Sequence, residues 1–155
     1  RLVSAAEVHF ILAEAALKGW TAGDAKSHYE SGVQASLNTW GVGGSYAAYI
    51  AVPAVAYNGT LAQIIEQKWI ASWTAATEAW FDYRRTGLPD LQAGPAAKRT
   101  VLPVRFYYMQ DELRMNAANA EDAMELLEVT GYTQADGNNS AWSKPWVIQG
   151  TNKPW

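Results

Sequence analysis

The chain has 155 residues, of which 49% are hydrophobic and 17% charged, and this composition is typical of a protein that can bury a core. A formal net charge of -3 without a Lys/Arg cluster argues against nucleic acid or an anionic lipid surface as a partner. The absence of cysteine excludes disulfides, thiol catalysis and thiolate metal sites, and no apolar run is long enough to span a bilayer. We expect a single domain over residues 1–155.

The chain starts at Arg1, without an initiator methionine, a basic leader or an apolar signal segment. We therefore expect an excised or processed fragment of a longer protein. Any targeting signal or lipid anchor would then lie upstream of Arg1.

The first predicted helix covers residues 5–18. Ser4 and Glu7 form a capping-box pattern, in which the serine hydroxyl accepts a backbone N–H at the start of a helix. Gly19 supplies the residue that most often ends a helix in the left-handed conformation.

The second predicted helix covers residues 22–40, between a similar capping pattern at Thr21 and a glycine at Gly41. The short connection between the two helices predicts an antiparallel hairpin over residues 1–40, which resembles one tetratricopeptide unit. Small residues would let the two backbones approach closely: Ala13, Ala15, Ala16, Ala25, Gly32 and Ala35.

A third and longer helix is predicted over residues 61–85, within a segment 60–89 that ends on Gly87 and Pro89. Apolar side chains recur along it at spacings of three and four, which indicates one buried face. The stripe consists of Ala62, Ile65, Trp69, Ala76, Trp80 and Tyr83, with Trp73 alongside. We expect its tryptophans to be core residues and not a sugar-binding platform.

A short helix is predicted over 119–130, from Asn119 as its cap to Gly131. Three segments lack helical periodicity and read as irregular: 41–59, 90–118 and 132–155. They would hold at most a short helix near 46–51 and an extended stretch at 101–108. The expected fold class is all-α, with a tetratricopeptide-like pair, further helices and long loops.

Sequence motifs for metal and cofactor chemistry are missing. His9 and His28 are the only imidazoles, and neither has a second ligand at metal-binding spacing. We expect a partly buried His9, a surface His28, no metal site and no cofactor.

Glu78 and Asp82 lie four residues apart on the long helix, and a glycoside hydrolase needs two carboxylates. However, Arg84 and Arg85 follow within one turn, and ion pairing near the end of a helix is the commoner reason for such a pattern. We expect a structural role and no catalytic residues, with a helical glycoside hydrolase fragment as the alternative.

The chain has eight Trp and eight Tyr against three Phe. Those in irregular segments are the better ligand candidates, because surface loops carry function more often than core helices do. The candidate ligand-binding residues are Tyr46, Tyr49, Tyr57, Trp142 and Trp146, with Trp155 as a further tail aromatic.

Several segments occur together and in an order typical of one protein family. They are EVHFILAEA at 7–15, QIIEQKWIA at 63–71, EAWFDYRRTGLP at 78–89 and LPVRFYY at 102–108, followed by Glu112 and Asn116. With these segments the sequence resembles the SusD/RagB family of nutrient-binding outer-membrane lipoproteins, in their C-terminal portion. Met109 and Gln110 stand where such sequences often carry a proline.

The resemblance implies a SusD-like α-α superhelix and non-catalytic capture of glycans or similar nutrients at the extracellular face of the outer membrane. It also implies a SusC-like TonB-dependent transporter as the partner, and a membrane attachment only through an N-terminal lipid anchor upstream of this chain. A purely structural helical-repeat scaffold is the remaining alternative.

Overall fold

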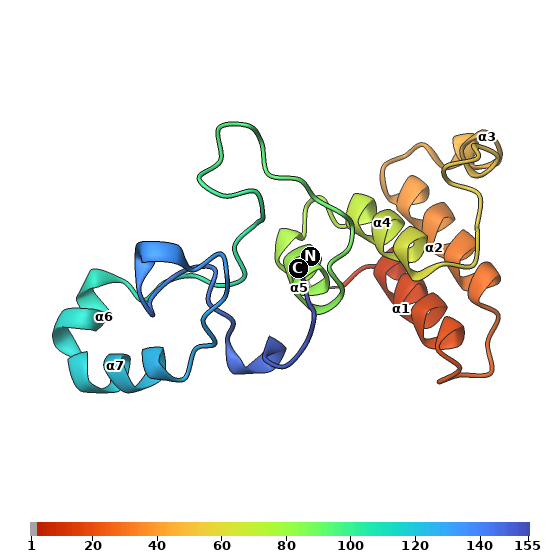
Figure 1. Cartoon of the computed structure of the whole chain (residues 1–155). Helices are drawn as coiled ribbons and strands as arrows, with labels where there is room; N and C mark the ends of the chain where they lie inside the picture. Colours follow the sequence, from red (N-terminus) through yellow and green to blue (C-terminus); the bar gives the residue numbers. More distant parts are fainter. Residues whose placement is uncertain (1–2) are drawn as a thin grey trace. The chain divides into compact units, whose positions relative to one another are not determined.

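A computed structural model describes residues 3–155, apart from the side chain of residue 135. The described residues form helices and irregular loops, with an isolated antiparallel bridge between Glu128 and Lys144 and no strand (Figure 1). The predicted all-α fold class is confirmed. The chain divides into two compact units, Arg1–Tyr83 and Arg84–Trp155. The expected single domain stays a prediction.

Helices α1 (Ala5–Leu17) and α2 (Ala25–Thr39) form the predicted hairpin of unit 1. The Ser4 hydroxyl accepts the Glu7 N–H at 3.0 Å, which confirms the predicted cap of α1. The predicted start of α2 at residue 22 is wrong. Asp24 caps this helix by accepting the Ser27 N–H at 2.8 Å, and Asp is a better cap than Thr.

The end of α1 is closed by a turn in which Gly19 has a φ of +70°. The Trp20 N–H donates to the Ala15 carbonyl at 2.9 Å, and the Gly19 N–H donates to the Ala16 carbonyl at 3.0 Å, as in a Schellman motif. The Trp20 side chain is 73% exposed, so backbone hydrogen bonds close this turn.

The core of unit 1 lies where α1, α2 and α4 (Leu61–Ala71) meet (Figure 1). Phe10 from α1, Tyr29 and Val33 from α2, and Ile64 from α4 are almost fully buried in it. Gly32 allows the close helix contact, because a Cβ atom at this position would lie only 2.9–3.1 Å from the Phe10 ring. One of the predicted small residues therefore has a clear steric role.

Between the hairpin and α4, the chain forms a short 3₁₀ turn, η1 (Gly43–Ser45), and helix α3 (Tyr46–Ile50). The predicted short helix near 46–51 is thus confirmed. Thr60 caps α4 by accepting the Gln63 N–H at 3.3 Å.

The single long helix predicted over 61–85 is wrong. The chain forms α4 and a separate helix α5 (Ala76–Thr86), with a turn at 72–75 closed by a hydrogen bond from the Ala75 N–H to the Ser72 carbonyl. The sequence Ser-Trp-Thr in this turn consists of modest helix formers, which favours a break over continuation.

The break also changes the environment of the predicted tryptophan stripe. Trp69 is 41% exposed and Trp73 is 74% exposed, so the expected core role of these two residues is wrong. Trp80 is half-buried and fits that role only in part. Residues that would share one face of a continuous helix do not have to share a face when the chain forms two separate helices. Ile64 and Ile65 fill the core from α4 in their place.

Unit 2 contains helices α6 (Gln110–Met115) and α7 (Ala117–Glu125). The predicted helix over 119–130 therefore starts two residues earlier and ends five residues earlier than expected, and α6 lies in a segment predicted to be irregular. Asn116 stands between α6 and α7 at the N-cap position of α7, where Asn119 was expected.

The remainder of unit 2 is irregular, as predicted for 132–155, with short 3₁₀ turns η2 (Gln134–Asp136) and η3 (Trp146–Ile148). Buried Arg99 connects its loops. Its guanidinium donates to the Thr133 carbonyl at 3.2 Å and to the Asp136 carboxylate at 2.6 Å, and it lies 4.0 Å from the centre of the Trp142 ring.

The two ends of unit 2 also meet. Gly87 has a φ of +74°, and a Cβ atom at this position would lie 2.6 Å from the backbone oxygen of Pro154. The neighbouring Trp155 donates its indole N–H to the Leu102 carbonyl at 3.1 Å. Glycine at position 87 therefore serves both the end of α5 and the approach of the C-terminal segment.

Candidate functional site

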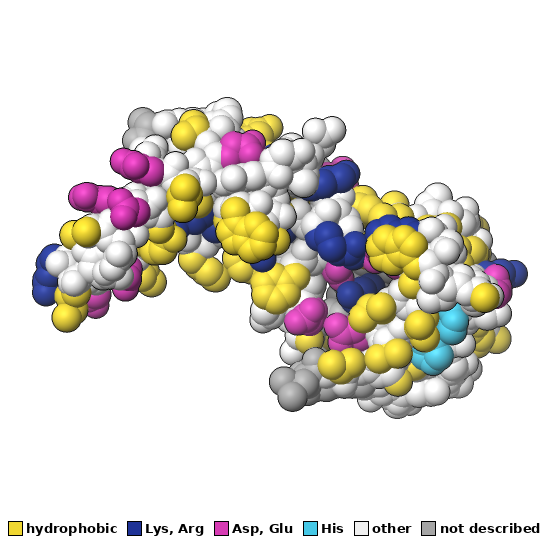
Figure 2. Space-filling model, turned by 90° about the horizontal axis from the view of Figure 1, so that it is seen from below, with side chains coloured by type: hydrophobic (Ala, Val, Ile, Leu, Met, Phe, Trp, Pro, Cys, Tyr) yellow, Lys and Arg dark blue, Asp and Glu magenta, His cyan; other side chains and the backbone are white. Residues whose placement is uncertain are grey.

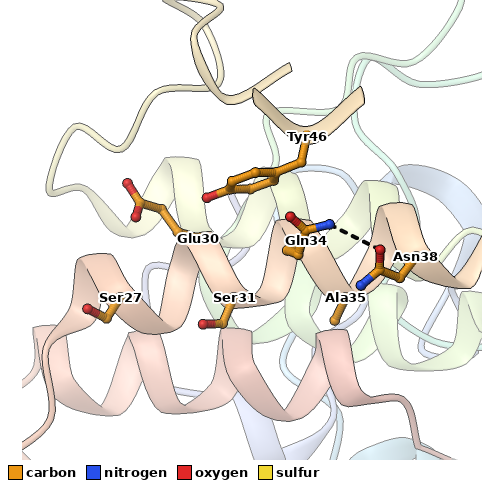
Figure 3. Close-up of a pocket in the computed structure, with 7 residues that line it drawn as sticks. All are labelled: Ser27, Glu30, Ser31, Gln34, Ala35, Asn38 and Tyr46. Carbon is orange, nitrogen blue, oxygen red and sulfur yellow. Dashed lines mark hydrogen bonds between the residues drawn. The ribbon is translucent and has the colours of Figure 1, made fainter. Parts of the chain in front are cut away.

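An open groove with a volume of about 450 Å³ lies between α2 and α3 in unit 1 (Figure 3). This volume falls in the range of about 300–1,000 Å³ that is common for sites of small ligands. The lining residues are Ser27, Glu30, Ser31, Gln34, Ala35, Asn38 and Tyr46. Polar side chains and one aromatic ring thus form the surface available to a ligand.

The spacing of polar residues along α2 creates the floor of the groove. Glu30, Gln34 and Asn38 lie four residues apart, which places them on one helix face. Gln34 donates its side-chain N–H to the Asn38 side-chain oxygen at 3.0 Å and to the Gly43 carbonyl at 3.3 Å. The two amides are therefore held in fixed orientations beside the turn that leads to α3.

Tyr46 is the first residue of α3 and forms the aromatic wall. Its side chain reaches from α3 over α2, with the hydroxyl end toward Glu30 (Figure 3). Part of the ring packs against the hydrophobic core, so the side chain is anchored. Burial, followed by the nearby Glu30 carboxylate, raises the pKa of the Tyr46 hydroxyl, which therefore stays neutral at physiological pH.

Glu30 is the only charged residue among those that line the groove. Lys26 lies one turn earlier on α2, with its ammonium nitrogen 3.8 Å from the Glu30 carboxylate. The Lys26 side chain is 60% exposed, and exposed pairs of this kind interact weakly in water. The groove therefore keeps an acidic character.

The structure brings Tyr46 to the groove but places the other two predicted tyrosines in structural contacts. Tyr49 donates its hydroxyl to the Gln67 side chain at 3.1 Å. The Tyr57 ring lies 5.2 Å from the ring of Tyr29, and both Tyr49 and Tyr57 pack against the core of unit 1.

The predicted aromatics of the tail lie in unit 2. Trp142 is half-buried, stacks with Arg99 and donates its indole N–H to the Val101 carbonyl at 3.0 Å. Trp146 in η3 is 82% exposed and presents its ring to solvent. Trp155 packs edge-on against Tyr132, with ring centres 4.7 Å apart, and so contributes to the packing of unit 2.

Sequence reasoning missed the polar half of the groove. It selected aromatics in loops, whereas Glu30, Gln34 and Asn38 lie on a helix. Their four-residue spacing was visible in the sequence and would have placed them on one face, although the same pattern is usual on any solvated helix. Only the position of α3 beside that face distinguishes these residues.

Asp82 forms an ion pair with Lys68 of α4, with 2.7 Å between the ammonium nitrogen and the carboxylate. Both side chains are largely buried, with 8% exposure for Lys68 and 12% for Asp82. The expected structural role of Asp82 is therefore supported, with a lysine partner that the sequence reasoning did not name. Glu78 is half-buried in the first turn of α5.

His9 on α1 and His28 on α2 face one another, with ring centres 5.9 Å apart, and Figure 2 shows the two imidazoles as neighbours on the surface of unit 1. Both are half-buried, as expected for His9, and His28 also reaches the surface. Among the described residues, no group of three or more His, Cys, Asp or Glu side chains could hold a metal ion.

Across residues 3–155, no helix combines the length and the apolar character needed to cross a membrane.

A family model and several solved structures point to one family. The family SusD-like_2, described as "Starch-binding associating with outer membrane", matches residues 1–109. A search of curated proteins gives no match.

Several solved structures are similar to the chain. A Bacteroidetes SusD-like protein is 31% identical with a TM-score of 0.75, and the alignment covers 91% of this chain and 29% of that protein. A SusD homologue from Bacteroides fragilis is 28% identical with a TM-score of 0.73, and the alignment covers 93% of this chain and 34% of that protein. A chitin-binding SusD homologue from Flavobacterium johnsoniae is 31% identical with a TM-score of 0.64, and the alignment covers 88% of this chain and 35% of that protein. The chain thus spans about a third of the length of these relatives.

Proposed function

This chain belongs to the SusD-like family of starch-binding proteins that associate with the outer membrane, and on that premise we propose that it forms part of a protein that binds glycans or similar nutrients at the cell surface without catalysis. The observation that carries the proposal is the family match over residues 1–109. A similar structure that is itself chitin-binding supports a carbohydrate ligand.

The groove between α2 and α3 is compatible with a binding role. An aromatic ring combined with amide and hydroxyl groups is the usual composition of a surface that recognises sugars, because the ring contacts the apolar face of a sugar and the polar groups bond its hydroxyls. Tyr46, Gln34 and Asn38 supply these groups here.

The ion pair between Asp82 and Lys68 supports binding over the alternative of glycoside hydrolysis. A hydrolase needs one carboxylate that can act as an acid and a second that can act as a base or nucleophile toward the same bond. The Asp82 carboxylate is largely buried and bonds the Lys68 ammonium, so it is not presented to a glycosidic bond.

We also propose that the protein delivers its ligand to a SusC-like TonB-dependent transporter and is held at the outer membrane by an N-terminal lipid anchor. Family membership supports this arrangement, since the family is described as associating with the outer membrane. Docking on a transporter requires a broad and partly apolar face.

Incubating the full-length protein with insoluble starch and insoluble chitin distinguishes a binding function from a catalytic one. We expect retention on at least one polymer and no release of soluble sugars. Release that disappears in Glu78→Gln would establish the hydrolase alternative, and retention on neither polymer would favour the scaffold alternative.

The transporter partner is tested by purifying the full-length lipoprotein in mild detergent from cells that also express the neighbouring barrel gene. We expect the two proteins to elute together. Elution of the lipoprotein alone would count against the partnership and would leave the glycan result unaffected.

A further inference from the structure

We propose that the groove between α2 and α3 is a contact site for an uncharged saccharide, with the Tyr46 ring as its stacking face and the amides of Gln34 and Asn38 as its hydrogen-bonding groups. The proposal rests on the proposed glycan-binding function and names a place and a ligand class for it.

The Tyr46 ring is positioned to contact a ligand. Tyr46 is half-buried and packs against the core of unit 1, so its position costs little further ordering when a ligand binds. The same ring lines the groove beside Glu30 and Gln34 (Figure 3). An anchored ring with an accessible side is a suitable stacking partner for the apolar face of a sugar.

The Gln34 and Asn38 amides each keep one polar group for a ligand. Gln34 uses its N–H group to bond Asn38 and Gly43, and Asn38 uses its side-chain oxygen to accept that bond. These bonds leave the Gln34 oxygen as an acceptor and the Asn38 N–H₂ group as a donor, and neither atom has a hydrogen-bond partner within the described part of the chain. A donor and an acceptor in the lining of one groove match a sugar hydroxyl or an acetamido group, each of which can both donate and accept.

The charge of the groove lining favours an uncharged ligand. The lining contains one carboxylate, Glu30, and no lysine, arginine or histidine. A uronate or a sulfated sugar would face this carboxylate without a compensating cation in the lining, and like charges at close range repel. The groove therefore discriminates against acidic saccharides and accepts uncharged ones.

The experiment uses the full-length protein and isothermal titration calorimetry with three probes: maltohexaose, hexa-N-acetylchitohexaose and hexagalacturonate. We expect at least one neutral probe to bind, and hexagalacturonate to bind about threefold to fivefold more weakly, as expected for one unfavourable contact between partly exposed charges. Tyr46→Ala should weaken the binding of the neutral probe by about fivefold to tenfold, in line with the loss of one aromatic contact. Asn38→Ala should weaken the binding of this probe by about threefold, as expected for one hydrogen bond.

Matched controls lie in unit 2. Tyr107→Ala removes a tyrosine that is 57% exposed, and Asn152→Ala removes an exposed asparagine. Both should bind the neutral probe as the wild type does. Glu30→Gln should reduce the difference in affinity between hexagalacturonate and the neutral probe. Because Glu30 is only partly buried at the edge of the groove, this variant should fold normally.

The outcomes separate the two proposals. If the wild type binds a neutral probe and both groove variants bind it equally well, the groove is not the contact site, while the proposed function stands. If hexagalacturonate binds as tightly as the neutral probe and loses affinity in Tyr46→Ala, the site exists but the uncharged ligand class is wrong. If the wild type binds none of the three probes, the proposed function and the inference both fail.

Discussion

Tyr29 offers the sharpest test of the packing in unit 1. The side chain is fully buried, with 0% exposure, and its hydroxyl donates to the Val55 carbonyl. Its ring lies edge-on to Phe10, with ring centres 6.0 Å apart. Tyr29→Phe keeps the ring and removes the hydroxyl, which leaves a buried acceptor without this donor. We expect the free energy of unfolding to fall by about 1–3 kcal/mol, the usual penalty for such a group.

The same residue predicts a dependence on alkaline pH. Burial, followed by the nearby Tyr49, Glu66 and Glu30, raises the pKa of Tyr29 above its ordinary value of 10. The folded state therefore keeps the proton when the unfolded state has lost it. The stability contributed by this neutral hydroxyl is fully present below pH 10 and is lost as the pH rises through the folded-state pKa.

Urea unfolding followed by circular dichroism measures both effects. The free energy of unfolding of the wild type and of Tyr29→Phe is determined at pH 7 and at a pH above 10, with exposed Tyr107→Phe as the control. The difference between wild type and Tyr29→Phe should shrink at the higher pH, whereas Tyr107→Phe should follow the wild type at both. Equal stability of Tyr29→Phe and wild type at pH 7 would refute the assigned hydrogen bond, and a pH-independent difference would refute the assigned shift.

Three further predictions concern the stability of unit 1, each measured by urea unfolding. Gly32→Ala should lower the free energy of unfolding by about 1–2 kcal/mol, because contact with the Phe10 ring outweighs the higher helix propensity of alanine. In the control Gly44→Ala the new Cβ meets nothing within 4 Å, so an equal loss there would contradict the steric explanation. Trp73→Ala should lower the free energy of unfolding by less than about 1 kcal/mol, because this side chain is 74% exposed. Phe10→Ala should lower it by about 3–5 kcal/mol, because Phe10 is a buried core residue. A similar loss in both variants would show that Trp73 is a core residue. Lys68→Met should cost about 3 kcal/mol because it removes the cation from a largely buried ion pair, and a neutral result would show that this pair is not formed.

Local sequence signals predicted much of the hairpin, the starts of α1 and α4 and the ends of α1 and α5. Ser4, Gly19 and Gly87 act through their own backbone or hydroxyl groups, so their effects are visible in a few neighbouring residues. The break between α4 and α5 was missed for the opposite reason. An apolar stripe at helical spacing continues across Ser72 to Ala75 in the sequence, and periodicity outweighed the modest helix propensity of that segment.

The candidate site was predictable only in part. A tyrosine in a loop is a reasonable ligand residue, and Tyr46 does line the groove. Tyr49 and Trp142 were also predicted from irregular segments. Their side chains instead donate hydrogen bonds to distant residues, Tyr49 to Gln67 and Trp142 to Val101. Which aromatic remains available to a ligand is decided by tertiary contacts that the sequence does not display.

The meeting of Gly87 with Pro154 has a consequence for the order of folding. This contact closes a loop of 67 residues (154 − 87), and the entropy of bringing distant residues together must be overcome before the contact can stabilise the chain. The bonds from Trp142 to Val101 and from Trp155 to Leu102 likewise join residues 41 and 53 positions apart. The α1–α2 hairpin instead forms from neighbours in sequence. We therefore expect the hairpin to form early, and unit 2 to become ordered only after its last residues are available.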